Sequence, residues 1–297
     1  MYRDSVEIGG IDMGTSIKAA ETTPGSWDTL SDIDAFATAV MNELKMMESE
    51  GIKICGKGPK PPLDGAVLRR AIMAIWCTCY CSTQWRAVGN MTGIPFGTLF
   101  SLFSRWTRLG VFRRLRKRLI VQWRDACGDT PMLSAVIVDS RSVRSSPTCG
   151  DRGIDGGKLV KGLKIHIAVD KHGFPLSVKI STANVHDSVG ILPVLQELSA
   201  QGFTGHALVD SSYKGSKLSK AAKELGIDVI AKTCGAGRNF LPEGIRWVVE
   251  RSFAWLSRYR RLNTFFDRTS DSLVAHIEIA FISILSRRIA RLKPVSA

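Results

Sequence analysis

The chain has 297 residues, which is enough for two domains or for one large domain with an additional segment. Its hydrophobic content of 44% and charged content of 23% are those of a folded globular protein and exclude a largely disordered or fibrous chain. The net charge of +14 is unusual, because a positive field of this size is expected to meet a polyanion. Nucleic acid is the first candidate partner, and a basic soluble protein without such a partner is the alternative.

Seven cysteines, an odd number scattered along the chain, favour free thiols in a reducing compartment over a disulfide framework. Cys77, Cys79 and Cys81 form a C-x-C-x-C run in an apolar segment without a neighbouring histidine, which favours buried side chains over a zinc site. The N-terminus has no export signal, and the longest apolar stretch, 273–285, is shorter than the roughly 20 residues of a membrane span. We therefore expect a cytoplasmic, nucleoid-associated protein with a buried helix at 273–285.

Positive charge is segregated along the sequence. Residues 1–62 form an acidic leader of unknown function with one expected helix over 30–50. Residues 1–63 hold six Lys or Arg against ten Asp or Glu, whereas between Asp64 and Arg124 there are eleven bases and only one acid. Within the second segment nothing neutralises the bases, so we expect them to face solvent or a polyanion.

Residues 63–128 are predicted to form a helical DNA-binding region. After a first helix from Asp64, the segment STQWRAVGNM, the turn TGIP and the segment FGTLFSLFSRWTRLG indicate helix, turn, helix. Gly93 and Pro95 supply the break and the start of the next helix. Apolar residues recur at three- and four-residue spacing for packing in the second helix, namely Leu99, Leu102, Phe103 and Trp106.

The following segment, 111–124, is predicted to be a basic helix that still carries apolar residues for a core face. DNA contact is the favoured interpretation of its charge, and a solvated surface helix is the alternative. The candidate DNA contacts of this region are Arg105, Arg108, Arg113, Arg114, Arg116, Lys117 and Arg118.

From residue 133 to 297 the pattern changes to strands alternating with helices. The order βββαβαβα predicts a mixed α/β fold, and it matches the order of the ribonuclease H-like superfold. The expected strands are 135–139, 163–170, 175–181, 206–210 and 228–232, and the expected helices are 187–202, 215–226, 245–262 and 272–292.

Two of these strands end in an acid in nearly the same way, because VIVDS places Asp139 and ALVDS places Asp210 after apolar residues. If the two strands are neighbours, both carboxylates emerge at the sheet ends about 4.8 Å apart, close enough to share a cation. The alternative is that Asp-Ser after a strand is a turn or capping signal, which explains one occurrence better than two.

A third acid comes from the helix at 245–262. At about 100° per residue its apolar positions cluster on one side, and Glu250 lies opposite with Arg246, Ser257 and Arg261. An exposed Arg-to-Glu pair is the alternative. Three carboxylates together repel one another unless cations neutralise them, so the set predicts two Mg²⁺ or Mn²⁺ ions and phosphodiester chemistry. The arginines expected to position DNA phosphates beside this site are Arg246, Arg258 and Arg261.

Five segments in order, VIVDSRSVRS, GKLVKGLKIHIAVD, STANVHDS, ALVDSSYKG and RWVVERSFAWLSRYRRL, resemble the DDE transposases of bacterial insertion sequences. The resemblance is to the insertion sequence five type, short-chain branch, and runs from about residue 60 to 290. It implies that Asp139 and Asp210 are the first two acids of the catalytic and metal-binding triad and that Glu250, four residues after Arg246, is the third. The sequence departs from the family at Ser257, where a basic residue is usual, and at Glu243, where a tyrosine is often found.

Two further motifs leave alternatives open. In NVHDS, Asp187 is expected to cap a helix with His186 as a structural or second-shell residue, and direct metal ligation by the pair is the alternative. In the glycine-rich segment GGKLVKGLK, a solvated hairpin and contact with the DNA backbone are both open for Lys158, Lys161 and Lys164.

The expected function is therefore DNA transposition. Such a protein binds the terminal inverted repeats of its element, cleaves double-stranded DNA and joins the freed 3′-hydroxyls to target DNA, working as a homo-oligomer because two ends are joined together. One rival is a nuclease or resolvase of the same superfold, which needs the metal site but not strand transfer. The other is a non-enzymatic helix-turn-helix regulator, which needs no metal.

Overall fold

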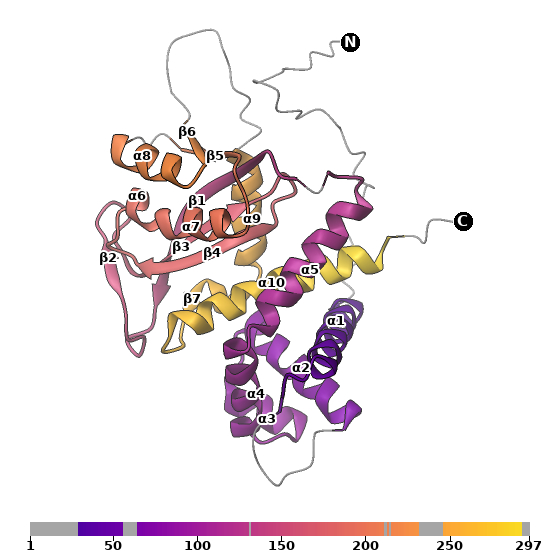
Figure 1. Cartoon of the computed structure of the whole chain (residues 1–297). Coiled ribbons are helices and arrows are strands. Elements are labelled where there is room, and N and C mark those ends of the chain that lie inside the picture. The colour runs from indigo at the N-terminus through magenta and orange to yellow at the C-terminus, as the bar shows by residue number, and fades with distance from the viewer. Residues whose placement is uncertain are drawn as a thin grey trace, which may run out of the picture.

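A computed structural model of the chain describes residues 29–55, 64–130, 132–210, 213, 215–231 and 246–292. Figure 1 shows two groups of elements, a mixed sheet with its covering helices and a bundle of N-terminal helices, with the long C-terminal helix α10 (Ser270–Ala290) lying against both. The division into an acidic leader (1–62), a helical region (63–128) and a catalytic domain (133–297) stays a prediction. The hydrophobic core beneath α10 is continuous between the two groups.

The sheet is built on β1 and follows the order β2-β3-β1-β5-β6, with β4 also paired to β3 and β7 to β1. β3 pairs antiparallel with β1 and with β4, whereas β5 pairs parallel with β1 and β6 parallel with β5. An antiparallel meander followed by parallel crossover strands is the ribonuclease H-like topology, so the predicted fold is confirmed. The strands are β1 (Ala135–Ser145), β2 (Gly153–Asp155), β3 (Val160–Val169), β4 (Pro175–Thr182), β5 (His206–Val209), β6 (Asp228–Ala231) and β7 (Thr264–Phe265).

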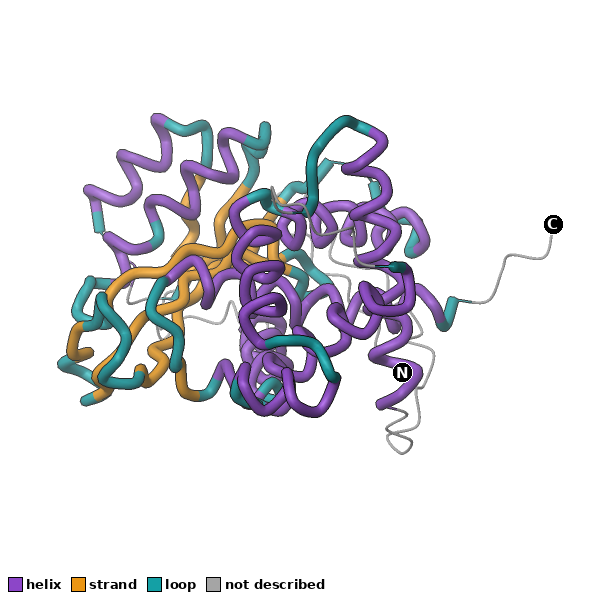
Figure 2. The backbone as a smooth tube through the Cα atoms, turned by 90° about the horizontal axis from the view of Figure 1, so that it is seen from below, coloured by secondary structure: helices purple, strands orange, loops and turns teal. Residues whose placement is uncertain are grey.

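Helices cover both faces of the sheet (Figure 2). One face packs against α7 and α8 in a core that includes Val136 and Val138 of β1, while Ile137 turns to the opposite face and packs in the core that holds α9 and α10. This division follows from the two-residue alternation of a strand. The helices of the sheet domain are α6 (Asp187–Gly190), α7 (Leu192–Ala200), α8 (Ser216–Glu224) and α9 (Arg246–Ser257).

The predicted helix-turn-helix is present in the N-terminal bundle. The helix α3 ends at Thr92, Gly93 follows in a left-handed conformation with φ +67°, and α4 begins at Phe96. All four apolar residues predicted to pack in the second helix are buried. The helices of the bundle are α1 (Thr29–Ser49), α2 (Gly65–Cys81), α3 (Trp85–Thr92), α4 (Phe96–Arg108) and α5 (Val111–Ala126).

The helix α10 is buried on every side from Ile277 to Ser286, as expected for a helix without a polar face. Its Ser283 hydroxyl accepts a hydrogen bond of 2.9 Å from the indole nitrogen of Trp76 on α2, which joins the C-terminal helix to the bundle. Among the described residues, no helix is both long and apolar enough to cross a membrane.

Several details differ from the sequence-based expectations. The expected helix over 187–202 is divided into α6 and α7, and the short strands β2 and β7 were not expected. β1 continues to Ser145 rather than ending at Asp139, because β3 pairs with it as far as Arg144. α9 ends at Ser257, so the predicted helix through 262 is wrong in its last turn. The described cysteines are free thiols, but of the C-x-C-x-C run only Cys79 is fully buried and Cys81 is exposed.

Arg116 of α5 was predicted to contact DNA, and this prediction is wrong. Its side chain is buried, forms an ion pair with Glu278 of α10 and donates a hydrogen bond to the carbonyl of Pro175 on β4. The sequence suggested a solvent-facing charge because the partner lies 162 positions away. The pair instead ties the bundle, α10 and the sheet together.

We predict that Glu278→Leu lowers the free energy of unfolding by about 3 to 5 kcal/mol, because it leaves the Arg116 guanidinium buried without a counter-charge. The double variant Arg116→Met/Glu278→Leu is expected to recover much of this loss. Urea titration followed by tryptophan fluorescence measures both. Arg69→Ala, which breaks a half-exposed pair with Asp34, serves as the control and should cost less than about 1 kcal/mol. A small effect of Glu278→Leu would contradict this account.

Candidate active site and basic surface

The first two predicted carboxylates are brought together by the register of β1 and β5. These strands pair in parallel, with Ala135 beside His206 and Ile137 beside Leu208. Extending this register by two residues puts Asp139 of β1 level with Asp210, which follows directly after the last residue of β5. Neighbouring strands are about 4.8 Å apart. The condition for a shared site, that the two strands are neighbours, is therefore met, although Asp139 lies within β1 rather than at its end.

Both carboxylates are on the sheet face that α9 covers. Ile137 and Leu208 pack in the core that includes the buried residues of α9, whereas Val138 and Val209 pack in the core of the opposite face. Because side chains alternate along a strand, Asp139 shares its face with Ile137, and Asp210 follows Leu208 at the same interval. Each of the two acids is partly exposed, so this pair is accessible at the surface of the domain.

The third predicted acid, Glu250, lies on α9 itself. Val249 and Phe253 of this helix are buried, and the Phe253 carbonyl accepts a hydrogen bond of 3.1 Å from the guanidinium of Arg141 on β1. This bond holds α9 against the strand that carries Asp139. Glu250 is exposed on the helix, as its polar position predicted.

The donor set suits a hard divalent cation, because carboxylate oxygens are the protein ligands that Mg²⁺ and Mn²⁺ prefer. Across the described residues, no three Asp, Glu, His or Cys side chains are arranged closely enough to form a metal site. The fold thus sets Asp139 beside Asp210 and keeps Glu250 on the covering helix. Two of the three predicted ligands thus lie on or directly after neighbouring strands, and the third lies on a helix that packs against this face of the sheet.

Sequence reasoning missed Tyr213, which follows Asp210 by three residues. Its ring is buried in the core of the opposite face, and its backbone N–H donates a 3.0 Å hydrogen bond to the Asp210 carbonyl. Burial raises the pKa of the Tyr213 hydroxyl, and the nearby carboxylates of Asp139, Asp187 and Asp210 raise it further. The tyrosine therefore remains a neutral hydroxyl beneath the acids, and the motif DSSYKG was the available signal.

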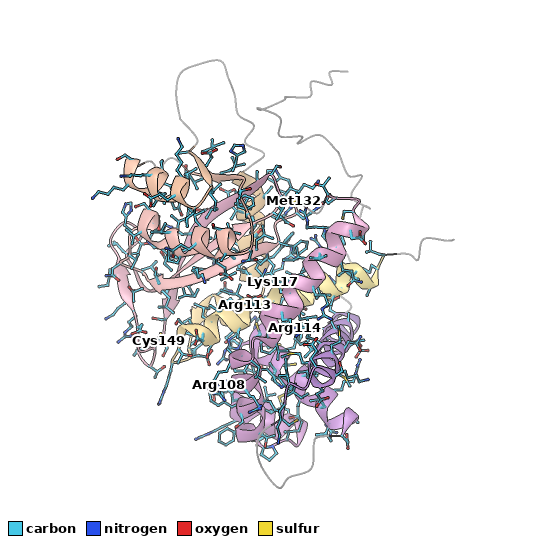
Figure 3. The ribbon with its side chains drawn as sticks, viewed as in Figure 1. Arg108, Arg113, Arg114, Lys117, Met132 and Cys149 are labelled. Atoms are coloured by element: carbon cyan, nitrogen blue, oxygen red, sulfur yellow. The ribbon has the colours of Figure 1, made fainter. Side chains whose placement is uncertain are left out.

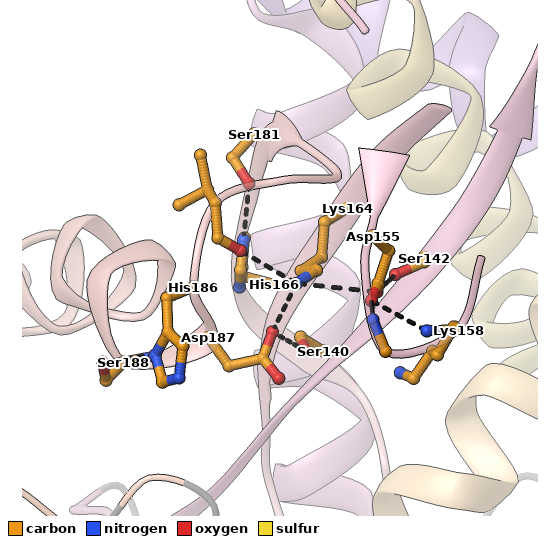
Figure 4. Close-up of polar contacts among 12 residues, drawn as sticks. Ser140, Ser142, Asp155, Lys158, Lys164, His166, Ser181, His186, Asp187 and Ser188 are labelled. Carbon is orange, nitrogen blue, oxygen red and sulfur yellow. Dashed lines mark hydrogen bonds and ion pairs between the residues drawn. The ribbon is translucent and has the colours of Figure 1, made fainter. Parts of the chain in front are cut away.

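Behind Asp139, a chain of polar contacts crosses the opposite face of the sheet (Figure 4). The Ser140 hydroxyl donates to an Asp187 carboxylate oxygen at 2.8 Å, and the same oxygen pairs with the ammonium of Lys164 at 2.9 Å. Lys164 also donates to the Val185 carbonyl at 2.8 Å and lies 3.7 Å from the Asp155 carboxylate. Burial alone raises the pKa of Asp187, but the hydrogen bonds from Lys164 and Ser140 lower it below its usual value.

This network changes two of the expectations. The sequence left contact with the DNA backbone open for Lys164. Its side chain is instead buried and forms an ion pair with Asp187, so it does not face DNA. The cap of α6 is His186, whose ring Nδ1 accepts from the Ser188 backbone N–H at 3.3 Å, whereas Asp187 occupies the first turn and contacts Ser140. The expected capping role of Asp187 is therefore wrong, and it reaches Asp139 only through the neighbouring serine.

Acidic residues of the N-terminal segment neutralise part of the basic helix α5. Arg114 pairs with Glu43 of α1 at 2.7 Å and with Glu50, and Arg118 pairs with Glu43 at 3.3 Å. Arg105 of α4 donates to the carbonyls of residues 53 and 54. The expectation that nothing neutralises these charges is therefore wrong, because α1 folds its acids onto the bases that follow it in sequence.

Other cations remain at the surface. Arg108 and Arg113 are exposed, and Lys117 lies one turn after Arg113 on α5 (Figure 3). Burial, with the charges of Arg116 and Arg113, lowers the pKa of Lys117. Arg261 is buried and holds Asp267 at 2.8 and 3.0 Å, so its predicted DNA contact is wrong. Lys158, Lys161 and Arg258 are exposed, and the side chain of Arg246 lies outside the described residues.

Comparison with known proteins gives two family matches. Residues 130–239 match a family described as "Transposase DDE domain", and residues 207–286 match a second family of the same description. A curated relative from Burkholderia cepacia, "Putative transposase for insertion sequence element IS402", is 35% identical over 144 residues. That alignment covers 46% of this chain and 66% of the relative, so the chain spans just under two thirds of the relative's length.

Solved structures give weaker likenesses. A piggyBac transposase synaptic complex with hairpin DNA aligns with a TM-score of 0.40 and 13% identity, covering 89% of this chain and 75% of that one. The Mos1 mariner paired end complex with Mn aligns with a TM-score of 0.29 and 8% identity, covering 90% and 97% of the two chains. At these values the likenesses assign no function.

Proposed function

We propose that this chain, which carries matches to transposase DDE domains between residues 130 and 286, is a DNA transposase of a bacterial insertion sequence. The observation that carries the proposal is the parallel register of β1 and β5, which brings Asp139 level with Asp210 on the face covered by α9. Paired carboxylates at neighbouring strands, in a chain with a net charge of +14, suit cleavage and joining of a polyanionic backbone.

Asp139 and Asp210 would hold Mg²⁺ or Mn²⁺, two ions in the full site, and Glu250 would supply the third carboxylate. When bound, such ions activate a water or a 3′-hydroxyl and stabilise the leaving oxygen of the cleaved phosphodiester. The chain's own residues prepare this site. The Ser140 backbone N–H donates to Asp139 at 2.7 Å, Arg141 anchors α9, and the network through Asp187 and Lys164 holds Ser140 in place.

The finer assignment follows the resemblance of the five motifs. We place the chain in the insertion sequence five type, short-chain branch, with the terminal inverted repeats of its element and a target DNA as double-stranded substrates. Because two ends must be cut and joined together, we propose a homo-oligomer on DNA, associated with the nucleoid.

A resolvase or nuclease of the same superfold is the second candidate, since the carboxylate pair alone does not require strand transfer. It predicts cleaved but unjoined products, so a gel assay that separates joined from cleaved DNA distinguishes the two enzymes. A helix-turn-helix regulator predicts DNA binding without any metal-dependent reaction.

We predict that Asp139→Asn, Asp210→Asn and Glu250→Gln each abolish cleavage and strand transfer while specific DNA binding is retained. Each amide is nearly isosteric with the acid, so packing is preserved, but a neutral oxygen is a poor ligand for Mg²⁺ or Mn²⁺. The substrate is a duplex carrying the gene-flanking end, incubated with Mg²⁺, Mn²⁺ or chelator, and binding is measured separately in chelator.

Asp228→Asn is the matched control, because Asp228 is an exposed acid of the same sheet. It lies on β6 beside His206 in the strand register, at the end of β5 that is opposite to Asp210. It should cleave and join like the parent. Full cleavage by the Asp210→Asn protein would contradict the assignment of the site.

The exposed cations of α4 and α5 are proposed to contact DNA phosphates. Arg108 and Arg113 are exposed, with Lys117 on the same side of α5, whereas Arg114 and Arg116 are paired with acids of α1 and α10. Lys158, Lys161, Arg246 and Arg258 are proposed as further contacts near the sheet. Three further arginines are held by partners on α1 or just after it, namely Arg105, Arg114 and Arg118. These side chains would have to leave their partners before they could contact DNA phosphates.

We expect Arg113→Ala/Lys117→Ala to weaken DNA binding and to reduce the log-log salt slope by up to about 0.9 for each lost phosphate contact. Fluorescence anisotropy at several salt concentrations gives the slope. Arg69→Ala, which removes a cation already paired with Asp34 on α1, is the control and should keep the parental slope. An unchanged slope in the double variant would show that this side of α5 does not bind DNA.

A further inference from the structure

The turn between β2 and β3 presents an apolar side chain to solvent. Leu159, the last residue of this turn, is 83% exposed and adopts φ +52°, one of only two positive φ values among the described non-glycine residues. A left-handed conformation in a hairpin turn favours glycine or asparagine, because an L side chain there crowds its own backbone. A bulky, exposed apolar residue in this conformation is an outlier that points to a function, and its side chain is accessible to a partner outside the chain.

The turn is held rigidly by the buried carboxylate of Asp155. One of its oxygens accepts the backbone N–H groups of Gly157 and Lys158, each at 3.1 Å, and the other accepts the Ser142 hydroxyl and lies 3.7 Å from the Lys164 ammonium. Figure 4 shows these contacts joining the turn to the network behind Asp139. The Leu159 side chain is therefore presented by a fixed scaffold rather than by a loose loop.

Two exposed lysines flank this apolar tip in the sequence. Lys158 precedes Leu159, and Lys161 follows two residues later, and both are exposed. Ile154, directly across from Lys161 in the β2–β3 ladder, is 56% exposed and widens the apolar surface. An apolar side chain flanked by cations complements DNA, in which a stacked base interior is bordered by phosphates.

We propose that the β2–β3 hairpin is a DNA wedge, in which Leu159 inserts between base pairs while Lys158 and Lys161 contact the adjoining phosphates. Apolar wedges of this kind partly unstack a base step and bend the duplex. The proposal rests on the proposed function, because it takes DNA as the substrate.

The wedge would act away from the cleaved bond. Ile167 lies beside Asp139 in the β1–β3 ladder, and Leu159 lies eight positions earlier in the chain, a distance of roughly 26 Å along β3 at about 3.3 Å per residue. The unstacked step therefore belongs to DNA that flanks the cleavage position.

The test uses the full chain in the presence of chelator, so that no cleavage occurs. The substrates are short duplexes from the DNA on both sides of the gene, and each duplex carries 2-aminopurine at one TA or CA step. Unstacking raises the fluorescence of this base. We expect the parent to raise it by about twofold or more on at least one duplex, and Leu159→Ala to lose most of that rise while affinity changes by less than about threefold. Met132→Ala, which truncates a side chain that is 75% exposed outside the hairpin, should keep the parental rise.

Two results would overturn the proposal: no fluorescence rise with the parent on any duplex, or an equal rise with Leu159→Ala. If Leu159→Ala instead changes the sedimentation of the free protein and leaves the fluorescence unchanged, the tip is a contact between protein copies. Either failure leaves the transposase assignment standing, because that assignment is judged by metal-dependent cleavage with the Asp139→Asn protein.

Discussion

The parallel pairing of β1 with β5 is the constraint on which the candidate site depends. It brings two acids that are 71 residues apart in sequence to the same level of the sheet, and strand alternation then sets both on the face that α9 covers. The same alternation sends Ser140 to the other face, where Asp187 and Lys164 hold it. A shift of one residue in this register would turn Asp139 or Asp210 to the wrong face and separate the carboxylates.

Charge is the second organising feature, and long-range pairing divides the cations into two classes. Some are committed inside the fold, such as Arg116 with Glu278 and Arg114 with Glu43. Others, including Arg113 and Lys158, stay at the surface where a polyanion can reach them. The acidic N-terminal helix thus leaves only a subset of the basic residues for the proposed contact with DNA. The buried helix α10 packs against both the bundle that carries these residues and the sheet that carries the acids.

Local patterns predicted the elements well, because alternation and helical spacing are recorded in adjacent residues. The succession of the main strands and helices along the chain, the turn at Gly93 and the exposed position of Glu250 followed from such patterns. The burial of Arg116 and Arg261 could not be predicted from such patterns. Their acidic partners come from α10 and from the loop before it, and no sequence spacing relates each arginine to its partner. The network around Lys164 was missed for the same reason, since its partners lie on β2 and α6, which the sheet brings to the same place.

The central claim is that Asp139 and Asp210 together hold a divalent cation. Titration of the purified chain with Mn²⁺, followed by the electron paramagnetic resonance signal of the free ion, tests it without any reaction. The account predicts that Asp139→Asn and Asp210→Asn each weaken Mn²⁺ binding by about tenfold or more, because each removes a charged ligand. Parental Mn²⁺ affinity in both variants would contradict it.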